Sequence, residues 1–335
     1  MKTTDITEAS PKRALSFLWN LFCISSIIGI WPRFIEPNLI CTTKLNLDIP
    51  QLPDDLEGLK ILQISDLHFS SHISSHFLDR LVKKAKNLNP DLIVFTGDFL
   101  CYGKLTNKKK LEIFLNRFHA RYGCYAILGN HDYSSGISIN KQGDYDIVSP
   151  PSSSLLSAFT RLLSTKLITG FTTDQAKRVP LNEELLILLK KTPFKLLHNQ
   201  TETIPIKGTK LNICGLGEYS SGKCLPEQAF HSYDKNYPGI ILLHNPDGSP
   251  LLKTYPGDII LSGHTHGGQV NLPWFWKKFT LLENMKLKKG LIQNDNKTVY
   301  INRGLGGVLS FRWFSPPEIL LLTLGKKSCK EKKLA

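Results

Sequence analysis

Three short segments of this chain end an apolar run with residues of the types that bind metal ions. They are Ser65-Asp66-Leu67-His68, Gly97-Asp98 and Gly129-Asn130-His131-Asp132, and the series continues downstream with His244 and Gly263-His264-Thr265-His266. Together these residues supply enough oxygen and nitrogen donors for two adjacent divalent metals. A centre with two metals is a standard apparatus for cleaving phosphate esters, so the motifs point to phosphoester chemistry.

Within two of these motifs, metal-binding side chains stand two residues apart. Residues with this spacing at a strand end can point to one side, so Asp66 and His68 can offer an anionic oxygen and a neutral imidazole to one metal. His264 and His266 repeat the spacing. Each of these two histidines can therefore reach a different metal.

The two middle motifs supply the remaining oxygen donors. Asp98 provides a carboxylate that can bridge two cations, and Gly97 before it lets the backbone approach closely. Asn130 offers a neutral carbonyl oxygen to the second metal, whereas the adjacent His131 projects differently and stays free for proton transfer. Asp132 is not a ligand in this interpretation; it orients His131 or caps the following turn.

A single histidine beside an apolar strand is ordinarily a surface or core residue, so no one residue carries the metal hypothesis. The hypothesis rests on the fixed order of the motifs at successive strand ends. Five other histidines fall outside this pattern and are assigned no role: His72, His76, His119, His198 and His231.

Alternating β-rich runs and helical patterns predict the elements that position the motifs. In the first half, strands are expected over 59–65, 92–96 and 125–128, with helices over 73–88 and 111–122. In the second half, strands are expected over 210–214, 239–244, 258–263, 298–302 and 318–324. Ligands gather beyond the carboxyl ends of strands in open α/β sheets, which is where Asp66, Asp98 and Asn130 lie. We therefore expect an α/β fold over residues 58–325, with two sheets covered by helices in a four-layer α/β/β/α sandwich.

The composition suits a large folded domain with an anionic partner. With 335 residues, of which 41% are hydrophobic, the chain can bury a full core. Its formal net charge is +14, and lysines fall in clusters such as 108–110, 286–289 and the tail over 326–335. Such clusters favour a phosphate substrate, a nucleic acid or an acidic membrane surface, and charge alone does not choose among them.

An uncharged run from Ala14 to Trp31 follows a polar start that ends in Lys12-Arg13. Its length is about the minimum for a membrane-spanning helix, and Pro32-Arg33 is expected to end it. No small-residue cleavage site follows cleanly, which disfavours a removable signal. We expect residues 1–33 to form a polar tail and a retained membrane anchor, with a helix lying in the membrane interface as the alternative. Residues 34–57 are then a strand and linker that lead into the main domain.

Two features disagree on the side of the membrane that the main domain occupies. The positive-inside rule puts the short N-terminal tail in the cytoplasm and sends a following domain outward. The seven scattered cysteines form no CxxC pair and are odd in number, which favours free thiols in a reducing compartment. We expect a single anchor in the inner (cytoplasmic) membrane, with the catalytic domain facing the cytoplasm.

Two segments are candidates for contact with lipid or with an apolar part of a substrate. The segment 133–193 differs in composition from both halves. Apolar residues with helical spacing predict one apolar helix face there, formed by Leu155, Leu156, Phe159, Leu162, Leu163 and Leu167. That face either packs on the core or belongs to a cap over the site. Later in the chain, aromatic residues alternate with lysines over 274–279, a pattern typical of a membrane interface or of a packed loop.

The ordered metal motifs resemble those of the calcineurin-like metallophosphoesterase family, and the match runs in order through residues 59–324 with no metal motif missing. The resemblance implies two metal ions and their ligands: Asp66, His68, Asp98 and His266 for one metal, and Asp98, Asn130, His244 and His264 for the other. It also implies His131 as general acid. With the family and these oxygen-rich donors, we expect manganese.

Further features are similar to membrane-tethered members that act in lipid A biosynthesis. They are the N-terminal apolar segment, Ile35-Glu36-Pro37, the run over 264–269, Asn302-Arg303-Gly304-Leu305-Gly306 and Pro316-Pro317-Glu318. This similarity implies hydrolysis of the pyrophosphate in a lipid nucleotide, UDP-2,3-diacylglucosamine, to UMP and the lipid monophosphate lipid X. One alternative is a generic membrane-associated phosphodiesterase or phosphatase. The other is a non-enzymatic nucleic-acid-binding protein, but binding alone does not call for this ligand set, so we expect no nucleic acid.

Overall fold

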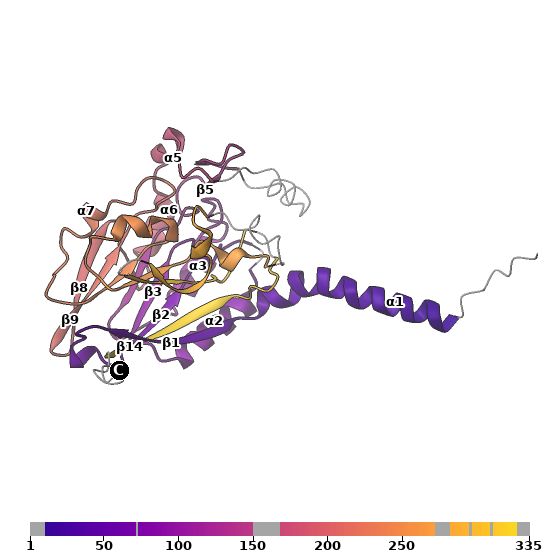
Figure 1. Cartoon of the computed structure of the whole chain (residues 1–335), viewed down its shortest axis with the longest axis horizontal. Helices are drawn as coiled ribbons and strands as arrows, with labels where there is room; N and C mark the ends of the chain where they lie inside the picture. Colours follow the sequence, from indigo (N-terminus) through magenta and orange to yellow (C-terminus); the bar gives the residue numbers. More distant parts are fainter. Residues whose placement is uncertain are drawn as a thin grey trace, which may run out of the picture.

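The computed structural model describes residues 11–71, 73–149, 168–271, 282–294, 297–308 and 311–326 (Figure 1). Its α-helices are α1 (Pro11–Ser25), α2 (Ser75–Asn87), α3 (Lys108–Leu115), α5 (Asp174–Arg178), α6 (Glu183–Leu189) and α7 (Pro226–Ala229). A π-helix, η1 (Ser26–Ile35), follows α1. Short 3-10 helices form η2 (Glu36–Asn38), η3 (Asp54–Leu56), η4 (Pro246–Leu252), η5 (His266–Gly268) and η7 (Met285–Leu287).

The described strands form two large sheets and one small hairpin. The first sheet has the order β1 (Cys41–Ile49), β14 (Glu318–Lys326), β2 (Lys60–Ile64), β3 (Leu92–Thr96), β4 (Cys124–Ile127) and β7 (Phe194–Leu196). The second has the order β12 (Gly290–Asn294), β13 (Lys297–Ile301), β11 (Ile259–Ser262), β10 (Gly239–Leu242), β9 (Thr209–Gly215) and β8 (Gln200–Ile206). The hairpin pairs β5 (Ile137–Ile139) with β6 (Tyr145–Ile147).

Each large sheet contains four neighbouring strands that run parallel. β2, β3, β4 and β7 run parallel in the first sheet. β9, β10, β11 and β13 run parallel in the second. Parallel strands end at the same edge of a sheet, so each sheet brings several strand-end motifs to one edge.

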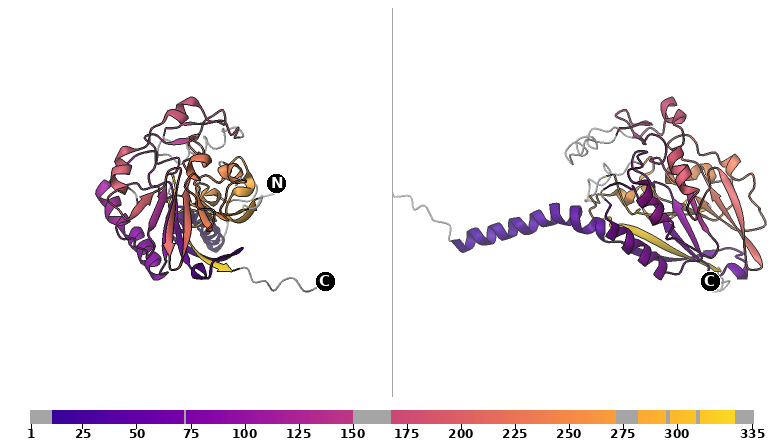
Figure 2. Two further views of the ribbon diagram at one scale, coloured as in Figure 1. Left: turned by 90° about the vertical axis from the view of Figure 1, so that its left-hand side faces the viewer. Right: turned by 180° about the vertical axis from the view of Figure 1, so that it is seen from behind.

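Alternating apolar side chains build the four predicted layers, which Figure 2 shows with the sheets face to face. One face of the first sheet packs against α2, α3 and α6, through side chains such as Ile93, Leu81 and Leu115. Its other face packs directly on the second sheet, as in the contact group of Val94, Ile213 and Leu261. The outer face of the second sheet is covered by the short α7, η4 and η7. The α/β/β/α sandwich is confirmed.

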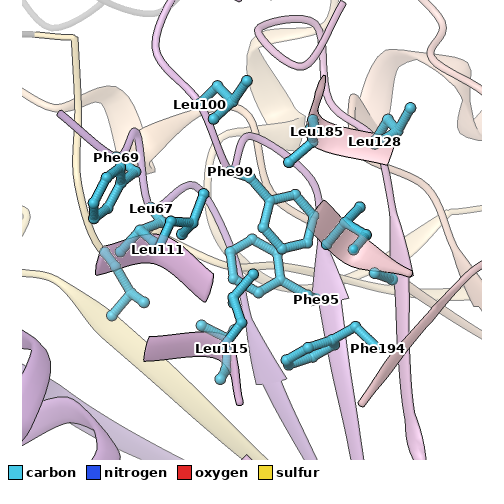
Figure 3. Packing of buried hydrophobic residues seen from close by; sticks show 14 of the residues in the cluster. Leu67, Phe69, Phe95, Phe99, Leu100, Leu111, Leu115, Leu128, Leu185 and Phe194 are labelled. Atoms are coloured by element: carbon cyan, nitrogen blue, oxygen red, sulfur yellow. The ribbon is translucent and has the colours of Figure 1, made fainter. Parts of the chain in front are cut away.

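Apolar residues next to the metal motifs hold the strand ends in the core. Leu67, between Asp66 and His68, is fully buried, and Phe99 follows Asp98 directly. The Phe99 ring stacks on Phe95 with centroids 3.8 Å apart, as Figure 3 shows. In these two motifs a side chain in the core stands next to a side chain at the sheet edge, and packing of the first helps to fix the position of the second.

The N-terminal helix differs from the prediction at its end. The helix does not stop at Pro32-Arg33 but continues through η1 and η2 to Asn38. Pro32 has no N–H to donate, and the wider turns of η1 accommodate it inside the helix. Within the described residues, Leu18–Asn38 is the one helix long and apolar enough to cross a membrane, and almost none of it is buried. In Figure 1 it projects away from the sandwich.

Two features were not specified by the sequence. The last strand, β14, belongs to the first sheet, between β1 and β2. The described ends of the 133–193 segment contribute buried residues such as Tyr145 and Leu188 to the core of the first sheet. The predicted helix face over 155–167, the aromatic run over 274–279 and the tail after 326 lie outside the described residues.

Candidate metal centre

The strand-end motifs of both sheets converge in the structure. Asp66, Asp98, His244 and His264 each come two residues after the last residue of a strand, namely β2, β3, β10 and β11. Asn130 follows β4 by three residues, and His68 and His266 complete the set. We call these seven residues the donor cluster. Five of the seven are buried, and His264 and His266 are half-buried.

One part of the donor cluster gathers around Asp66 and His68. The Nε2 atoms of His68 and His266 are 3.1 Å apart, and His266 Nε2 lies 3.9 Å from Asp66 Oδ1. Ligand atoms of these three residues all lie within 4.8 Å of one another. The arrangement offers two nitrogens and one oxygen to a single cation.

The other part gathers around Asn130. Its Oδ1 lies 3.0 Å from His244 Nε2 and 2.8 Å from His264 Nδ1. Between the two parts stands Asp98, whose Oδ2 is 3.3 Å from both His68 Nε2 and His244 Nε2. Asp98 is therefore placed to serve both parts, as a bridging carboxylate must.

The backbone of the donor cluster is strained. Five of its residues have a positive φ that side chains rarely adopt: Asp66 (51°), His68 (45°), Asp98 (58°), His264 (71°) and His266 (51°). Each such residue costs on the order of 1–3 kcal/mol, and such outliers gather at functional sites. The positive φ angles support a functional role for these residues. No sequence pattern predicts these backbone angles.

Glycine before a donor allows the two sheets to meet. A Cβ on Gly97, whose φ is +91°, would lie 2.6 Å from both Gly129 N and His244 Nδ1. The predicted close approach at Gly97 is therefore confirmed, and it involves a strand end of each sheet.

Burial sets the protonation of the donor cluster. Desolvation lowers the pKa of His68 and His264 to about 3, and it lowers the pKa of His266 well below its usual value. Burial also raises the pKa of Asp66 to about 7. Burial opposes charge on Asp98 and His244, but their mutual attraction holds the pKa of Asp98 well below its usual range and raises that of His244 to about 10.

These residues fit a pair of divalent cations. Asp66 Oδ2 is buried and has no hydrogen-bond partner among the described residues, although an isolated buried carboxylate oxygen is costly. His244 donates from Nδ1 to the Thr96 carbonyl at 2.7 Å, which leaves Nε2 directed at the cluster, where a metal would displace its proton. A hydrogen bond of this kind orients histidine ligands in metal sites. Neutral imidazoles, carboxylates and an amide oxygen are the donors that such cations need.

His131 lies beside the donor cluster with one ring nitrogen already occupied. The backbone N–H of Tyr102 donates to His131 Nδ1 at 3.0 Å, which assigns the proton of the neutral ring to Nε2. The ring packs edge-on against His68, with centroids 4.8 Å apart. Burial lowers the pKa of His131 and so favours this neutral form.

Among the described residues, no hydrogen bond joins the Asp132 carboxylate to the His131 ring, so the predicted role of orienting that ring is not seen. Its carboxylate accepts backbone N–H groups of Leu100 and Gly129 at 2.8 and 2.9 Å. These bonds join the loops that follow β3 and β4. Asp132 therefore positions Asp98 and Asn130 through their backbones.

Residues outside the motifs also reach the centre. Arg312 is fully buried and places Nη2 3.4 Å from His266 Nδ1, which no sequence pattern indicated. Arg303, of the run Asn302-Arg303-Gly304, donates from Nε to Glu318 at 3.1 Å. Of the histidines without an assigned role, His76, His119 and His231 are exposed and His198 is half-buried; His72 lies outside the described residues.

Comparisons with known proteins agree with this geometry. The family model described as calcineurin-like phosphoesterase matches residues 59–268. The chain is 40% identical over 305 residues to the UDP-2,3-diacylglucosamine pyrophosphatase LpxG of Chlamydia trachomatis, covering 88% of this chain and 92% of that protein. The Chlamydia muridarum protein of the same name is also 40% identical, with the same coverage. An uncharacterized metallophosphoesterase of Bacillus subtilis, YkuE, is 28% identical over 88% of both chains.

Proposed function

The chain belongs to the calcineurin-like phosphoesterase family and is a hydrolase, and from this premise we propose that it cleaves the pyrophosphate bond of UDP-2,3-diacylglucosamine. Addition of water to that bond releases UMP and leaves the lipid monophosphate, lipid X. The observation that carries the proposal is the 40% identity, over 88% of the chain, to two chlamydial enzymes named for this activity.

Two divalent cations would be held by the donor cluster. Asp66, His68 and His266 would hold one, Asn130, His244 and His264 would hold the other, and Asp98 would bridge them. When bound, the cations supply Lewis acidity that activates water and offsets the charge of the phosphates. We propose manganese for both positions, because the donors mix carboxylate and amide oxygens with imidazole nitrogens.

His131 is the proposed proton donor to the leaving oxygen. Since Tyr102 occupies Nδ1, the ring offers its Nε2–H to the substrate. The leaving group is a phosphate, whose second pKa is about 6, so it needs less help from an acid than an alkoxide does. A hydrogen bond from a neutral imidazole therefore suits this reaction.

The substrate joins a charged nucleotide to two acyl chains, and the chain has features for both. The net charge of +14 attracts a pyrophosphate over long distances. The apolar helix over Leu18–Asn38 has the length to anchor the protein in a bilayer. We propose a single anchor in the inner membrane with the catalytic domain in the cytoplasm, which agrees with the free thiols of the described cysteines.

Turnover by the purified full-length protein tests this function. With manganese and detergent, we expect hydrolysis of UDP-2,3-diacylglucosamine to exceed that of a generic soluble diester. His131→Ala should lower the rate by about 100-fold or more, as loss of a positioned proton donor does. His119→Ala, an exposed histidine, is the matched control and should retain full activity. Equal turnover of both substrates would instead favour a generic phosphodiesterase.

A further inference from the structure

The base of the N-terminal helix is tied to a loop of the catalytic domain by buried hydrogen bonds. The Glu36 side chain is 2% exposed and accepts Trp31 Nε1–H at 2.8 Å within the helix. It also accepts the backbone N–H groups of Phe314, at 3.0 Å, and Ser315. The Pro32 carbonyl accepts the Arg312 backbone N–H at 2.8 Å. We call Trp31, Pro32, Glu36, Arg312 and Ser315 the joint.

The joint leads directly to a residue of the donor cluster. Ser315 donates from Oγ to the His266 backbone carbonyl at 2.6 Å. The Arg312 guanidinium donates to the carbonyls of Ser315 and Arg303 at 2.8 and 2.9 Å, and it borders the His266 ring. Glu36 and His266 are thus connected through one residue, Ser315, although they lie far apart in the sequence.

Sheet topology places the helix and the donor cluster at the same edge. β1 runs parallel to β14, with Cys41 opposite Glu318. β14 runs antiparallel to β2, so the start of β14 lies beside the end of β2, which Asp66 follows by two residues. The chain therefore leaves the anchor and enters the sheet at the edge where the metal motifs lie. Only Leu39 and Ile40 separate η2 from β1, which leaves little slack for independent motion.

Large aromatic side chains surround the joint and remain open to solvent. Phe34 is 65% exposed, Phe314 57% and Trp31 40%. Aromatic residues at the end of an apolar helix are typical of the boundary between lipid and water. The apolar helix and these exposed aromatic side chains at its base have the chemistry that fits a phospholipid bilayer.

We propose that the joint holds the donor cluster at the surface of the bilayer, so that the lipid substrate reaches the centre without leaving the membrane. Glu36 is the positioning residue: its carboxylate satisfies three N–H donors at once and fixes the helix to the loop that contacts His266. The proposal rests on the proposed function for the identity of the substrate. The position of the domain relative to the bilayer is independent of that identity.

Energy transfer on vesicles tests the position without any substrate. The full-length protein carries a fluorophore at position 289. This position is next to Lys288, whose carbonyl accepts a hydrogen bond from Thr265 beside the donor cluster, so the label reports the position of the cluster. The vesicles contain phosphatidylethanolamine, phosphatidylglycerol and an acceptor-labelled lipid. We expect efficient transfer for the wild type. Glu36→Ala should remain bound to the vesicles through its helix but show less transfer, because the helix is then held to the domain only by the Pro32–Arg312 bond and the short Leu39-Ile40 link. Glu57→Ala, an exposed residue of the same segment, is the matched control and should match the wild type.

Kinetics on two substrates complete the test. Glu36→Ala should lower kcat/KM about tenfold on UDP-2,3-diacylglucosamine in vesicles, less than the roughly 100-fold that an ångström of misplacement at the reacting atoms can cost. It should keep its manganese content and its rate on a soluble diester. Glu36→Gln keeps the size of the side chain but turns an N–H toward N–H donors, so it should show a smaller loss of the same kind and guards against misfolding of the alanine variant.

The outcomes separate the two proposals. Unchanged energy transfer in both Glu36 variants would overturn the joint, as would equal losses on both substrates together with lost manganese. A wild type that shows the expected transfer but does not hydrolyse the lipid nucleotide would overturn the proposed function and leave the joint standing.

Discussion

The N-terminal helix and the donor cluster distribute polar and apolar side chains in opposite ways. On the helix, Leu18, Phe22 and Ile27 are each more than half exposed. In the donor cluster, Asp66, Asp98 and His244 are at most 1% exposed. Each arrangement is unfavourable for a protein alone in water, because apolar surface is left wet in one region and charged groups are desolvated in the other.

Each region therefore suits a partner of opposite character. A bilayer would cover the exposed helix, and cations would compensate the buried carboxylates and imidazoles. The joint at Glu36 connects the two regions, so both partners are met at one end of the molecule. The predictions below remove one partner or one region at a time.

The largest effect is expected at the centre of the donor cluster. Asp98→Ala removes the carboxylate that lies 3.3 Å from two histidines and should lower kcat by roughly 1,000-fold or more, about 4 kcal/mol of transition-state stabilisation. Initial rates with manganese provide the measurement. Asp174→Ala, at an exposed aspartate, should leave the rate unchanged. Full activity of the Asp98 variant would exclude the metal mechanism.

A charge on the helix should affect membrane binding and not chemistry. Leu21 and Ile24 are 52% and 55% exposed. A lysine in the middle of a spanning helix costs about 3 kcal/mol, so Leu21→Lys and Ile24→Lys together should release the protein from vesicles. Flotation of vesicles measures binding, and the rate on a soluble diester should stay as in the wild type. A loss of that rate would show that the helix acts on the centre directly.

Removal of the cations should destabilise the domain, since it leaves their donors buried and uncompensated. At a metal concentration of 100 times Kd, binding contributes about 2.7 kcal/mol, so chelation should lower Tm by roughly 5 °C. Differential scanning calorimetry in detergent, with and without chelator, measures the shift. The Asp98→Ala variant should show a smaller shift, and an equal shift in that variant would place the metals elsewhere.

Metal binding should release a number of protons that depends on pH. At pH 8, His244, with a pKa of about 10, carries a proton that the metal displaces. At pH 6, Asp66, with a pKa of about 7, carries a second, whereas His68 and His264, with a pKa of about 3, carry none. Titration calorimetry in buffers of different ionisation enthalpy should show the release of about one proton at pH 8 and about two at pH 6. For each proton released, the free energy of metal binding should weaken by about 1.4 kcal/mol per unit decrease in pH. No release at pH 6 would contradict this assignment.

The sequence predicted the parts of the fold that depend on periodicity. The strands before Asp66, Asp98 and His264 are buried on both faces and read as short apolar runs, so their existence and their order were predictable. The place of β14 in the first sheet was not predictable, because the neighbour of a strand in a sheet depends on the path of the chain in space. The end of the helix beyond Pro32 was missed for a related reason: η1 tolerates proline through a wide turn that no residue pattern signals.

The site was predictable as a set of residues and less so as an arrangement. The motifs named every member of the donor cluster, because metal chemistry restricts the residue types. The left-handed backbone at Asp66 and His266, the role of Asp132 in joining two loops, and the contacts of Glu36 and Arg312 all depend on groups brought together by folding. A buried glutamate next to an apolar helix has no sequence signature that separates it from an exposed one.

The most direct test of the central claim is electron paramagnetic resonance of the full-length protein loaded with manganese. A donor cluster that shares Asp98 predicts two manganese ions per chain whose spins are coupled, and Asp98→Ala should abolish the coupling. A signal from magnetically isolated manganese in the wild type, or one ion per chain at saturation, would contradict the two-metal centre.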